Sequence, residues 1–78
     1  MARQPGDPAI QAAVGERLRH RRETQGLSQE KLGELAGVDR GYVSLIERGK
    51  VNPTVTTLVR LAAALASNPA DLVDGLGV

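Results

Sequence analysis

The chain has 78 residues, enough for one small domain, and its formal net charge at pH 7 is only +1. Cysteine is absent, which excludes disulfides and thiolate metal sites, and the lack of Phe and Trp leaves Leu, Val, Ile and Ala to build the core. Long Ala/Leu/Glu/Arg stretches favour helix over strand, so we expect an all-α fold.

No segment of the sequence resembles a signal peptide or a membrane span. The longest apolar run is 61–66, far short of the length that crosses a bilayer. We therefore expect a soluble, cytoplasmic protein that makes no contact with a membrane.

Residues 1–8 are polar and include two prolines, so a disordered N-terminal arm is expected before a domain that spans 9–74. The first helix is predicted over 9–25, and Gly26 supplies its stop. Its apolar stripe consists of Ile10, Val14 and Leu18. Arg21, Arg22 and Gln25 lie on the same face of the helix, beyond the end of this stripe. At the other end of the chain, residues 75–78 are expected to fray.

Two short helical patterns follow within residues 29–48, hinged at Ala36-Gly37-Val38. Gly37 sits where the chain must turn sharply, a position that favours positive φ and therefore glycine. Ser28 and Asp39 precede the two helices as N-caps. Each cap is framed by a hydrophobic staple, which predicts the packed pairs Leu27–Leu32 and Val38–Val43. Helices joined by so short a turn form a helix-turn-helix, whose second helix can enter the DNA major groove.

Two further helices complete the predicted fold. Thr54 caps a helix that runs to Ala66, whose inward positions are Val55, Leu58, Leu61, Ala62 and Leu65. Asn68 caps a short helix that Pro69 opens and that runs to Asp74.

Glu47 shares the inward face of the helix over 40–48 with Val43 and Ile46. An unpaired carboxylate there would cost several kcal/mol. The hypothesis is a bidentate ion pair with Arg22, or less favourably with Arg21, that ties the first helix to the third. The alternative is that Glu47 turns into water.

The opposite face of this helix carries Gly41, Ser44, Leu45 and Arg48, with Arg40 and Tyr42 on its flanks. Arginine can read guanine bidentately, and short residues let the backbone approach bases. Base contacts are therefore predicted for Arg40, Gly41 and Ser44. The alternative is that Arg40 only solvates the surface.

Contacts to the DNA backbone are predicted around this helix. Gln29 opens the preceding helix and can offer its amide and its N–H to a phosphate. Further candidates are Ser28, Tyr42, Lys50 and Asn52. Ser28 could instead be a cap only, and Tyr42 could instead pack its ring beside the hinge.

Catalysis finds little support in the sequence. The single histidine, His20, lies within a run of arginines and has no cysteine to work with, so neither a catalytic triad nor a metal cluster can be assembled. No enzyme activity, metal or other cofactor is expected.

The stretches GLSQEKLGELAGV and YVSLIERGKVNP, with the Ala- and Leu-rich helix that follows, resemble the phage-repressor and Cro-like (XRE-type) helix-turn-helix family over residues 14–74. The DRGYVSLIERG stretch is similar to controller proteins of restriction–modification systems. The resemblance implies a five-helix, lambda-repressor-like bundle that binds operator DNA as a symmetric homodimer and regulates transcription. RNA polymerase is a further candidate partner.

By position, the resemblance implies that Gln29 contacts phosphate, that Arg40, Gly41 and Ser44 face bases, and that Tyr42 contacts the backbone. It also implies a buried pair between Arg22 and Glu47. Members of the family often follow the fourth helix with glycine and an apolar residue, where this chain has Ala66 and Ser67.

A dimer interface is predicted at the C-terminal end, together with the fourth helix, because the tail holds more apolar residues than a frayed monomer needs. These residues are Leu72, Val73, Leu76 and Val78. For Leu72 the alternative is that it closes the core. A different class of function also remains open, namely an antitoxin-like or adaptor module that uses the same fold to bind protein.

Overall fold

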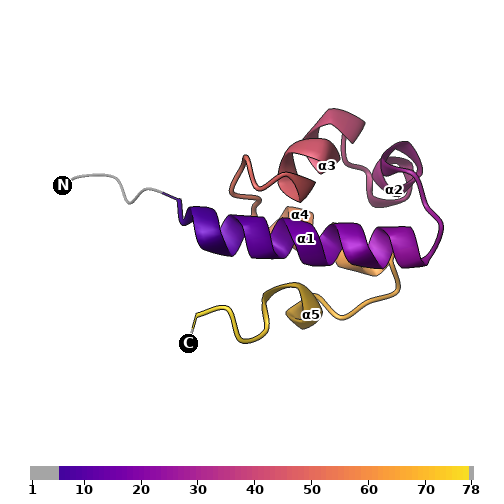
Figure 1. The fold of residues 1–78 in the computed structure, drawn as a ribbon. Coiled ribbons are helices and arrows are strands. Elements are labelled where there is room, and N and C mark those ends of the chain that lie inside the picture. The colour runs from indigo at the N-terminus through magenta and orange to yellow at the C-terminus, as the bar shows by residue number, and fades with distance from the viewer. Residues whose placement is uncertain (1–5, 78) are drawn as a thin grey trace.

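The computed structural model describes residues 6–77, which form five helices and no strand. The helices are α1 (Pro8–Thr24), α2 (Gln29–Ala36), α3 (Arg40–Glu47), α4 (Val55–Ala64) and α5 (Ala70–Val73). The all-α, five-helix prediction is therefore confirmed. Figure 1 shows α2 and α3 on one side of α1 and α5 on the other. Within the described residues, no helix combines the length and the apolarity that a bilayer crossing requires.

The first helix begins earlier than predicted. The Asp7 side chain accepts hydrogen bonds from the backbone N–H groups of Ala9 and Ile10, and Pro8 occupies the first helical position. Proline is well suited there because the N–H it lacks would have no helical partner. The helix therefore begins at Pro8, one residue before the predicted Ala9, and residues 1–5 of the expected arm lie outside the described residues.

The helix-turn-helix is built by local capping. Ser28 Oγ accepts the N–H of Lys31 at 3.0 Å, and an Asp39 carboxylate oxygen accepts the N–H of Gly41 at 2.8 Å. Between the two helices Gly37 has φ 71°, the left-handed conformation that was expected to require glycine. Leu27 and Val38, the outer members of the two predicted staples, pack against the core.

The core is a single aliphatic cluster to which all five helices contribute. Its fully buried side chains are Leu18, Leu32, Val43, Ile46, Leu61, Leu65 and Leu72. Two expectations are corrected by this burial. Val55, predicted to face inward, is 76% exposed because it opens α4 beyond the reach of its neighbours. Leu72 has no exposed surface and closes the core, so it is not available to a dimer interface.

Helices α1 and α3 approach so closely that a side chain would not fit between them. A Cβ atom at Gly15 would lie 2.7 Å from the carbonyl oxygen of Glu47, closer than Cβ atoms come to backbone. The absence of a side chain at Gly15 lets the end of α3 rest directly on α1. Close packing of this kind fixes the position of α3 against the rest of the domain.

An ion pair fastens the same two helices. Arg22 donates from Nε to Glu47 Oε2 at 2.6 Å and from Nη2 to Oε1 at 2.9 Å. Its Nη1 donates to the carbonyl of Leu27 at 2.8 Å, so all three guanidinium nitrogens are used. The side chains of Arg22 and Glu47 are only 11% and 3% exposed. Arg22 and not Arg21 is thus the partner of Glu47.

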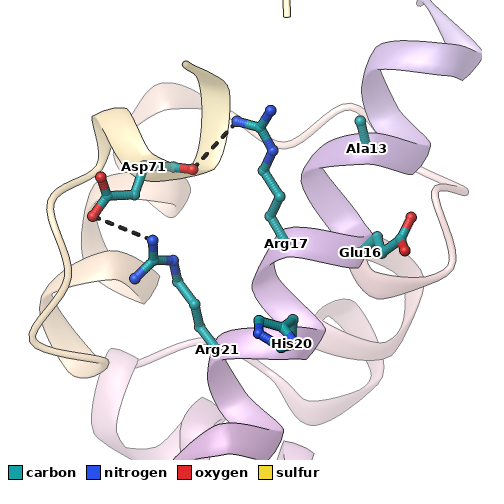
Figure 2. A pocket seen from close by; sticks show the side chains of 6 residues that line it. All are labelled: Ala13, Glu16, Arg17, His20, Arg21 and Asp71. Carbon is teal, nitrogen blue, oxygen red and sulfur yellow. Dashed lines mark hydrogen bonds and ion pairs between the residues drawn. The ribbon is translucent and has the colours of Figure 1, made fainter. Parts of the chain in front are cut away.

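Arg21 and Arg17 hold α5 instead. Arg17 Nη1 donates to the backbone carbonyl of Asp74 at 2.8 Å and to that of Asp71 at 3.3 Å. Figure 2 shows the contact with Asp71, together with the ion pair in which Arg21 Nη2 lies 3.5 Å from the Asp71 carboxylate. The segment after α5 forms a turn over 74–77, in which Leu76 N–H donates to the Val73 carbonyl at 3.2 Å. The fraying predicted for 75–78 thus concerns a segment that the structure describes as this turn up to residue 77, and Val78 lies outside the described residues.

The end of α4 contains the one non-glycine residue with positive φ among the described residues, Ala66 at 51°. The N–H groups of Ala66 and Ser67 donate to the carbonyls of Ala63 and Ala62 at 3.0 and 2.8 Å. These are the two hydrogen bonds of a Schellman motif, which usually places glycine in the left-handed position. The helix therefore ends at Ala64, before the predicted Ala66, in a conformation that alanine adopts at a cost of about 1 kcal/mol.

We expect Ala66→Gly to stabilise the protein by about 1 kcal/mol, because glycine adopts the left-handed conformation without strain. In thermal unfolding followed by circular dichroism this corresponds to a rise of roughly 4–8 °C in Tm. Ala63→Gly is the matched control, since the same substitution at an exposed position within α4 should destabilise by about 1 kcal/mol. A fall in Tm for both variants would contradict the strain at Ala66.

Glu47→Gln should destabilise the protein by about 3 kcal/mol, because it leaves the Arg22 guanidinium buried without its counter-charge. The expected loss in Tm is at least about 12 °C in the same measurement. The double variant Arg22→Met/Glu47→Met is the control, since removing both charges should restore much of the lost stability. An unchanged Tm for Glu47→Gln would show that the pair contributes nothing.

Candidate nucleic-acid interface

One face of α3 is buried and the opposite face is accessible. Val43, Ile46 and Glu47 are buried against α1 and α2. The accessible face holds the three residues for which base contacts were predicted, Arg40, Gly41 and Ser44, together with Tyr42, Leu45 and Arg48. Of these six, Arg40, Gly41 and Arg48 are exposed and the others are half-buried. The only acidic residue of α3 therefore points away from this face.

Gly41 has a structural reason to lack a side chain. A Cβ atom at this position would lie 2.9 Å from the Asp39 carboxylate oxygen, which caps α3 by accepting the Gly41 N–H. Glycine therefore keeps the cap undisturbed. It also leaves the backbone at the start of the accessible face open to a close approach by another molecule.

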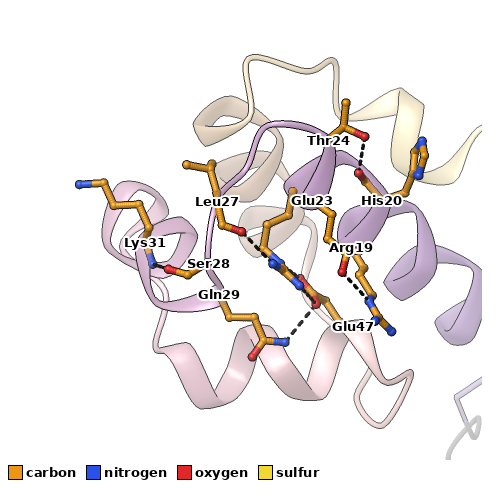
Figure 3. Close-up of polar contacts among 10 residues, drawn as sticks. Arg19, His20, Glu23, Thr24, Leu27, Ser28, Gln29, Lys31 and Glu47 are labelled. Atoms are coloured by element: carbon orange, nitrogen blue, oxygen red, sulfur yellow. Dashed lines mark hydrogen bonds and ion pairs between the residues drawn. The ribbon is translucent and has the colours of Figure 1, made fainter.

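Gln29 is oriented by the ion pair beneath α3. Its amide Nε2 donates to Glu47 Oε1 at 3.0 Å, and Figure 3 shows the side chain pointing from the start of α2 toward Glu47. The amide oxygen and the second amide hydrogen are left for another partner. Gln29 and Ser44 both border a hollow of about 270 Å³, which is completed by Arg19, Arg22, Glu47 and Arg48. The start of α2 and the accessible face of α3 thus form one continuous surface.

The charge of this surface is positive at neutral pH. Arg22 and Glu47 neutralise each other, which leaves Arg40 and Arg48 exposed on α3. The hydrogen bond to Glu47 raises the pKa of the Arg22 guanidinium, against the opposing effect of burial. The contribution that this raised pKa of Arg22 makes to stability is fully present below the ordinary guanidinium pKa and is lost only as the pH rises through the raised value. The anchor of α3 is therefore intact throughout the physiological range.

A second hollow, of about 630 Å³, opens on the other flank of α3. It lies between the α2–α3 turn, α3 and α4, and is bordered by Gly37, Val38, Asp39, Gly41, Tyr42, Leu45, Thr57 and Arg60. Tyr42 is half-buried there and packs against the core, as the packing interpretation of this residue requires.

The remaining predicted contact residues surround this face at its two ends. Ser28 is exposed and caps α2, so it has the structural role that was one of its two interpretations. Lys50 and Asn52 are exposed in the loop after α3, and the Lys50 N–H donates to the Leu45 carbonyl at 2.9 Å. Neither of these two borders the hollows described above.

Two basic residues that were not predicted as DNA contacts also border the hollows beside α3. They are Arg48, at the end of α3, and Arg60, on α4. The signal for Arg48 was its place on the outward face of the helix. The signal for Arg60 was weaker, namely an arginine in a helix that has no acidic residue to pair with. Their position beside α3 depends on how α4 crosses it, which the sequence does not give.

The hollow between α1 and α5, of about 510 Å³, has a different character. Both arginines that line it, Arg17 and Arg21, already bind α5. His20 also lines this hollow and lies on the exposed side of α1 (Figure 2). Within residues 6–77, no group of three or more His, Cys, Asp or Glu side chains could hold a metal ion.

Comparison with known proteins agrees with this arrangement. A family model described as helix-turn-helix matches residues 18–72. The control protein C.SmaI of Serratia marcescens is 36% identical over 69 residues, which are 88% of this chain and 82% of that protein.

Two solved structures share the fold. The restriction–modification controller protein C.AhdI from Aeromonas hydrophila superposes with a TM-score of 0.80 at 44% identity, over 82% of this chain and 97% of that one. The P22 c2 repressor, solved in complex with a synthetic operator, gives a TM-score of 0.74 at 35% identity, over 80% of this chain and 94% of that one. The chain therefore belongs to the helix-turn-helix family, as a DNA-binding transcriptional regulator of the Cro/C1 type.

Proposed function

We propose that this regulator recognises a specific operator by placing the accessible face of α3 in the major groove. The observation that carries the proposal is that Arg40 is exposed on a helix whose only acidic residue, Glu47, is buried in an ion pair. Phosphates therefore meet no exposed carboxylate on α3 itself. Arg40 can donate to O6 and N7 of guanine, while Gly41 and Ser44 allow a close approach to neighbouring bases.

The proposed contacts to the DNA backbone frame this face. At the start of α2, Ser28 and Gln29 present a cap, an oriented amide and free backbone N–H groups, which suit a phosphate. Tyr42 contributes its hydroxyl, and the loop after α3 contributes Lys50 and Asn52. Such contacts fix the register of the protein on the duplex without reading its sequence.

We further propose that the regulator acts as a homodimer on a palindromic operator. With Leu72 in the core, the C-terminal part of the interface consists of Val73, which is 44% exposed, and the half-buried Leu76. Val55 and Val59 are exposed on α4, the other element proposed to take part in the interface. A two-fold interface of this kind would present two α3 helices about 34 Å apart, to half-sites ~10 bp apart.

The similarity to C.SmaI and C.AhdI supports a role as a controller of a restriction–modification system, with RNA polymerase as a further partner when transcription is activated. The proposed action on DNA implies a location in the cytoplasm and a binding protein, not an enzyme. The genes beside its own test the controller role, since neighbouring methyltransferase and endonuclease genes are expected.

Arg40→Ala should cost about 1–3 kcal/mol of binding at one base pair and relax the sequence preference there. Gln29→Ala is the matched comparison, because loss of a phosphate contact should weaken binding to all sequences by a similar factor. Both effects are measured by gel-shift titration against the DNA upstream of its own gene and against a scrambled duplex. If wild type and Arg40→Ala bind both duplexes equally, specific readout by α3 is wrong and the adaptor function is favoured.

Val73→Glu should raise the dimer dissociation constant at least about tenfold, because two-fold symmetry brings an uncompensated carboxylate from each chain into an apolar contact. Sedimentation velocity over a concentration series measures the change. Leu35→Glu is the control, since Leu35 is a similarly exposed aliphatic residue on α2, outside the proposed interface. Dimerisation that is equally strong in wild type and Val73→Glu would place the interface elsewhere.

A further inference from the structure

Helix α5 is too short to keep its conformation without the rest of the domain. It has four residues, Ala70–Val73, and of these only Leu72 is buried. A single helical turn is unstable in water by itself, because ordering the first turn costs more entropy than its few hydrogen bonds recover. The position of α5 therefore depends on what holds it against α1, the helix on which it packs.

The polar contacts that hold α5 come from one side of α1, where Arg17 and Arg21 lie one helical turn apart (Figure 2). Arg17 donates to the carbonyls of Asp71 and Asp74 at the C-terminal end of α5, where carbonyl groups lack a partner within the helix. Arg21 pairs with the Asp71 carboxylate and donates from Nη1 to Ser67 Oγ at 3.3 Å. We call this set of contacts the α5 clasp.

The α5 clasp is accessible to water and ions, unlike the ion pair that anchors α3. The side chains of Arg21 and Asp71 are 38% and 43% exposed, whereas those of Arg22 and Glu47 are 11% and 3% exposed. Salt screens exposed ion pairs and has much less effect on buried ones. Salt therefore weakens the attachment of α5 while the helix-turn-helix keeps its anchor.

The segment that joins α4 to α5 favours release of α5. Ala66 is held there at φ 51°, a left-handed conformation that is costly for alanine. Once α5 leaves α1, the chain at Ala66 is free to relax, so the strain is relieved. The strain and the exposed clasp both lower the free energy of local unfolding, in which one segment opens while the rest of the domain stays folded.

The proposed dimer face lies on this same segment. Val73 belongs to α5 and Leu76 to the turn after it, so the positions of both depend on how α5 sits on α1. Resting on the homodimer proposed above, we propose that α5 is a salt-sensitive switch, which opens separately from the helix-turn-helix and allows dimerisation only while the α5 clasp is closed. Dimerisation and closure then stabilise each other, because a partner that binds only the closed form raises its population.

Hydrogen exchange of backbone amides, followed by NMR, tests whether α5 opens by itself. The N–H groups of Leu72 and Asp74 report on α5, and that of Val43 reports on α3. Ile46→Val removes one buried methyl group from α3 and should speed exchange at Val43 about fivefold. The two α5 amides should keep their rates, because their opening leaves α3 intact. Equal acceleration at all three amides would show that α5 opens only when the whole domain unfolds, and would overturn the switch.

The salt dependence of the same exchange tests the α5 clasp. Raising NaCl from about 0.05 to 0.5 M should speed exchange at Leu72 and Asp74 about threefold in wild type, the effect of screening an exposed ion pair. Arg21→Met removes the pair and should abolish this dependence. Arg19→Met is the matched control, since it removes the same charge from α1 at an exposed pair with Glu23 and should keep the wild-type dependence. No dependence in wild type, or an equal one in both variants, would overturn the salt-sensitive switch.

Sedimentation velocity over a concentration series tests the link to dimerisation. Arg17→Met/Arg21→Met removes the α5 clasp and should raise the dimer dissociation constant at least about tenfold, the factor reached when α5 is open in about two thirds of the monomers, because both partners must be closed. Arg19→Met should dimerise like wild type. A double variant that dimerises normally, or that loses the dimer without faster exchange at Leu72 and Asp74, would overturn the switch. Wild type that stays monomeric would instead overturn the proposed homodimer.

Discussion

The position of α3 depends on a buried ion pair. Arg22 and Glu47 are joined by two hydrogen bonds of 2.6 and 2.9 Å, and both are largely withdrawn from water. A buried pair is weak evidence for stability, because desolvating two charges cancels much of their attraction. Its contribution here is geometric. Two parallel hydrogen bonds fix the distance and rotation of α3 on α1 more tightly than aliphatic contacts would, and Glu47 then accepts a third hydrogen bond from Gln29. The anchor of α3 and the orientation of a proposed phosphate contact are thus one network.

Missing side chains constrain the same helix. Gly15 lets the backbone at the end of α3 approach α1, and Gly33 leaves space for the Val38 carbonyl in the turn before α3. At the start of α3, the absence of a side chain at Gly41 leaves room for the Asp39 carboxylate that caps the helix. An added methyl at Gly15 or Gly33 would meet backbone, which cannot move aside as a flexible side chain can. α3 is therefore held at both ends by backbone packing and along its buried face by Val43, Ile46 and Glu47. The residues on its accessible face take no part in this packing, so their identities are free of its constraints.

Much of this could be predicted because its signals are local. Ser28, Asp39 and Gly37 each act within one helical turn, so the two caps and the turn follow from residue type and spacing. The partner of Glu47 followed from the helical angle of Arg22. The misjudged features depend on where helix ends lie relative to distant neighbours. Val55 has the helical angle of a core residue but opens α4 beyond its packing partners. The C-terminal segment after α5 folds back on α1 because Arg17 binds carbonyls 54 and 57 residues away.

The basic run in α1 has a different significance in the structure than a charge count suggests. Arg17 and Arg21 reach α5, and Arg22 reaches α3, so adjacent turns of one helix hold elements on both of its sides (Figures 1 and 2). With the dimer face proposed at Val73 and Leu76, the path from that face to the accessible face of α3 runs through these three arginines. The spacing of two recognition helices in a symmetric dimer would then be set by a rigid route, α5 to α1 to α3. A modest net charge is compatible with the proposed DNA binding on this basis, because three of the ten basic residues hold the helices together while Arg40 and Arg48 stay exposed on α3.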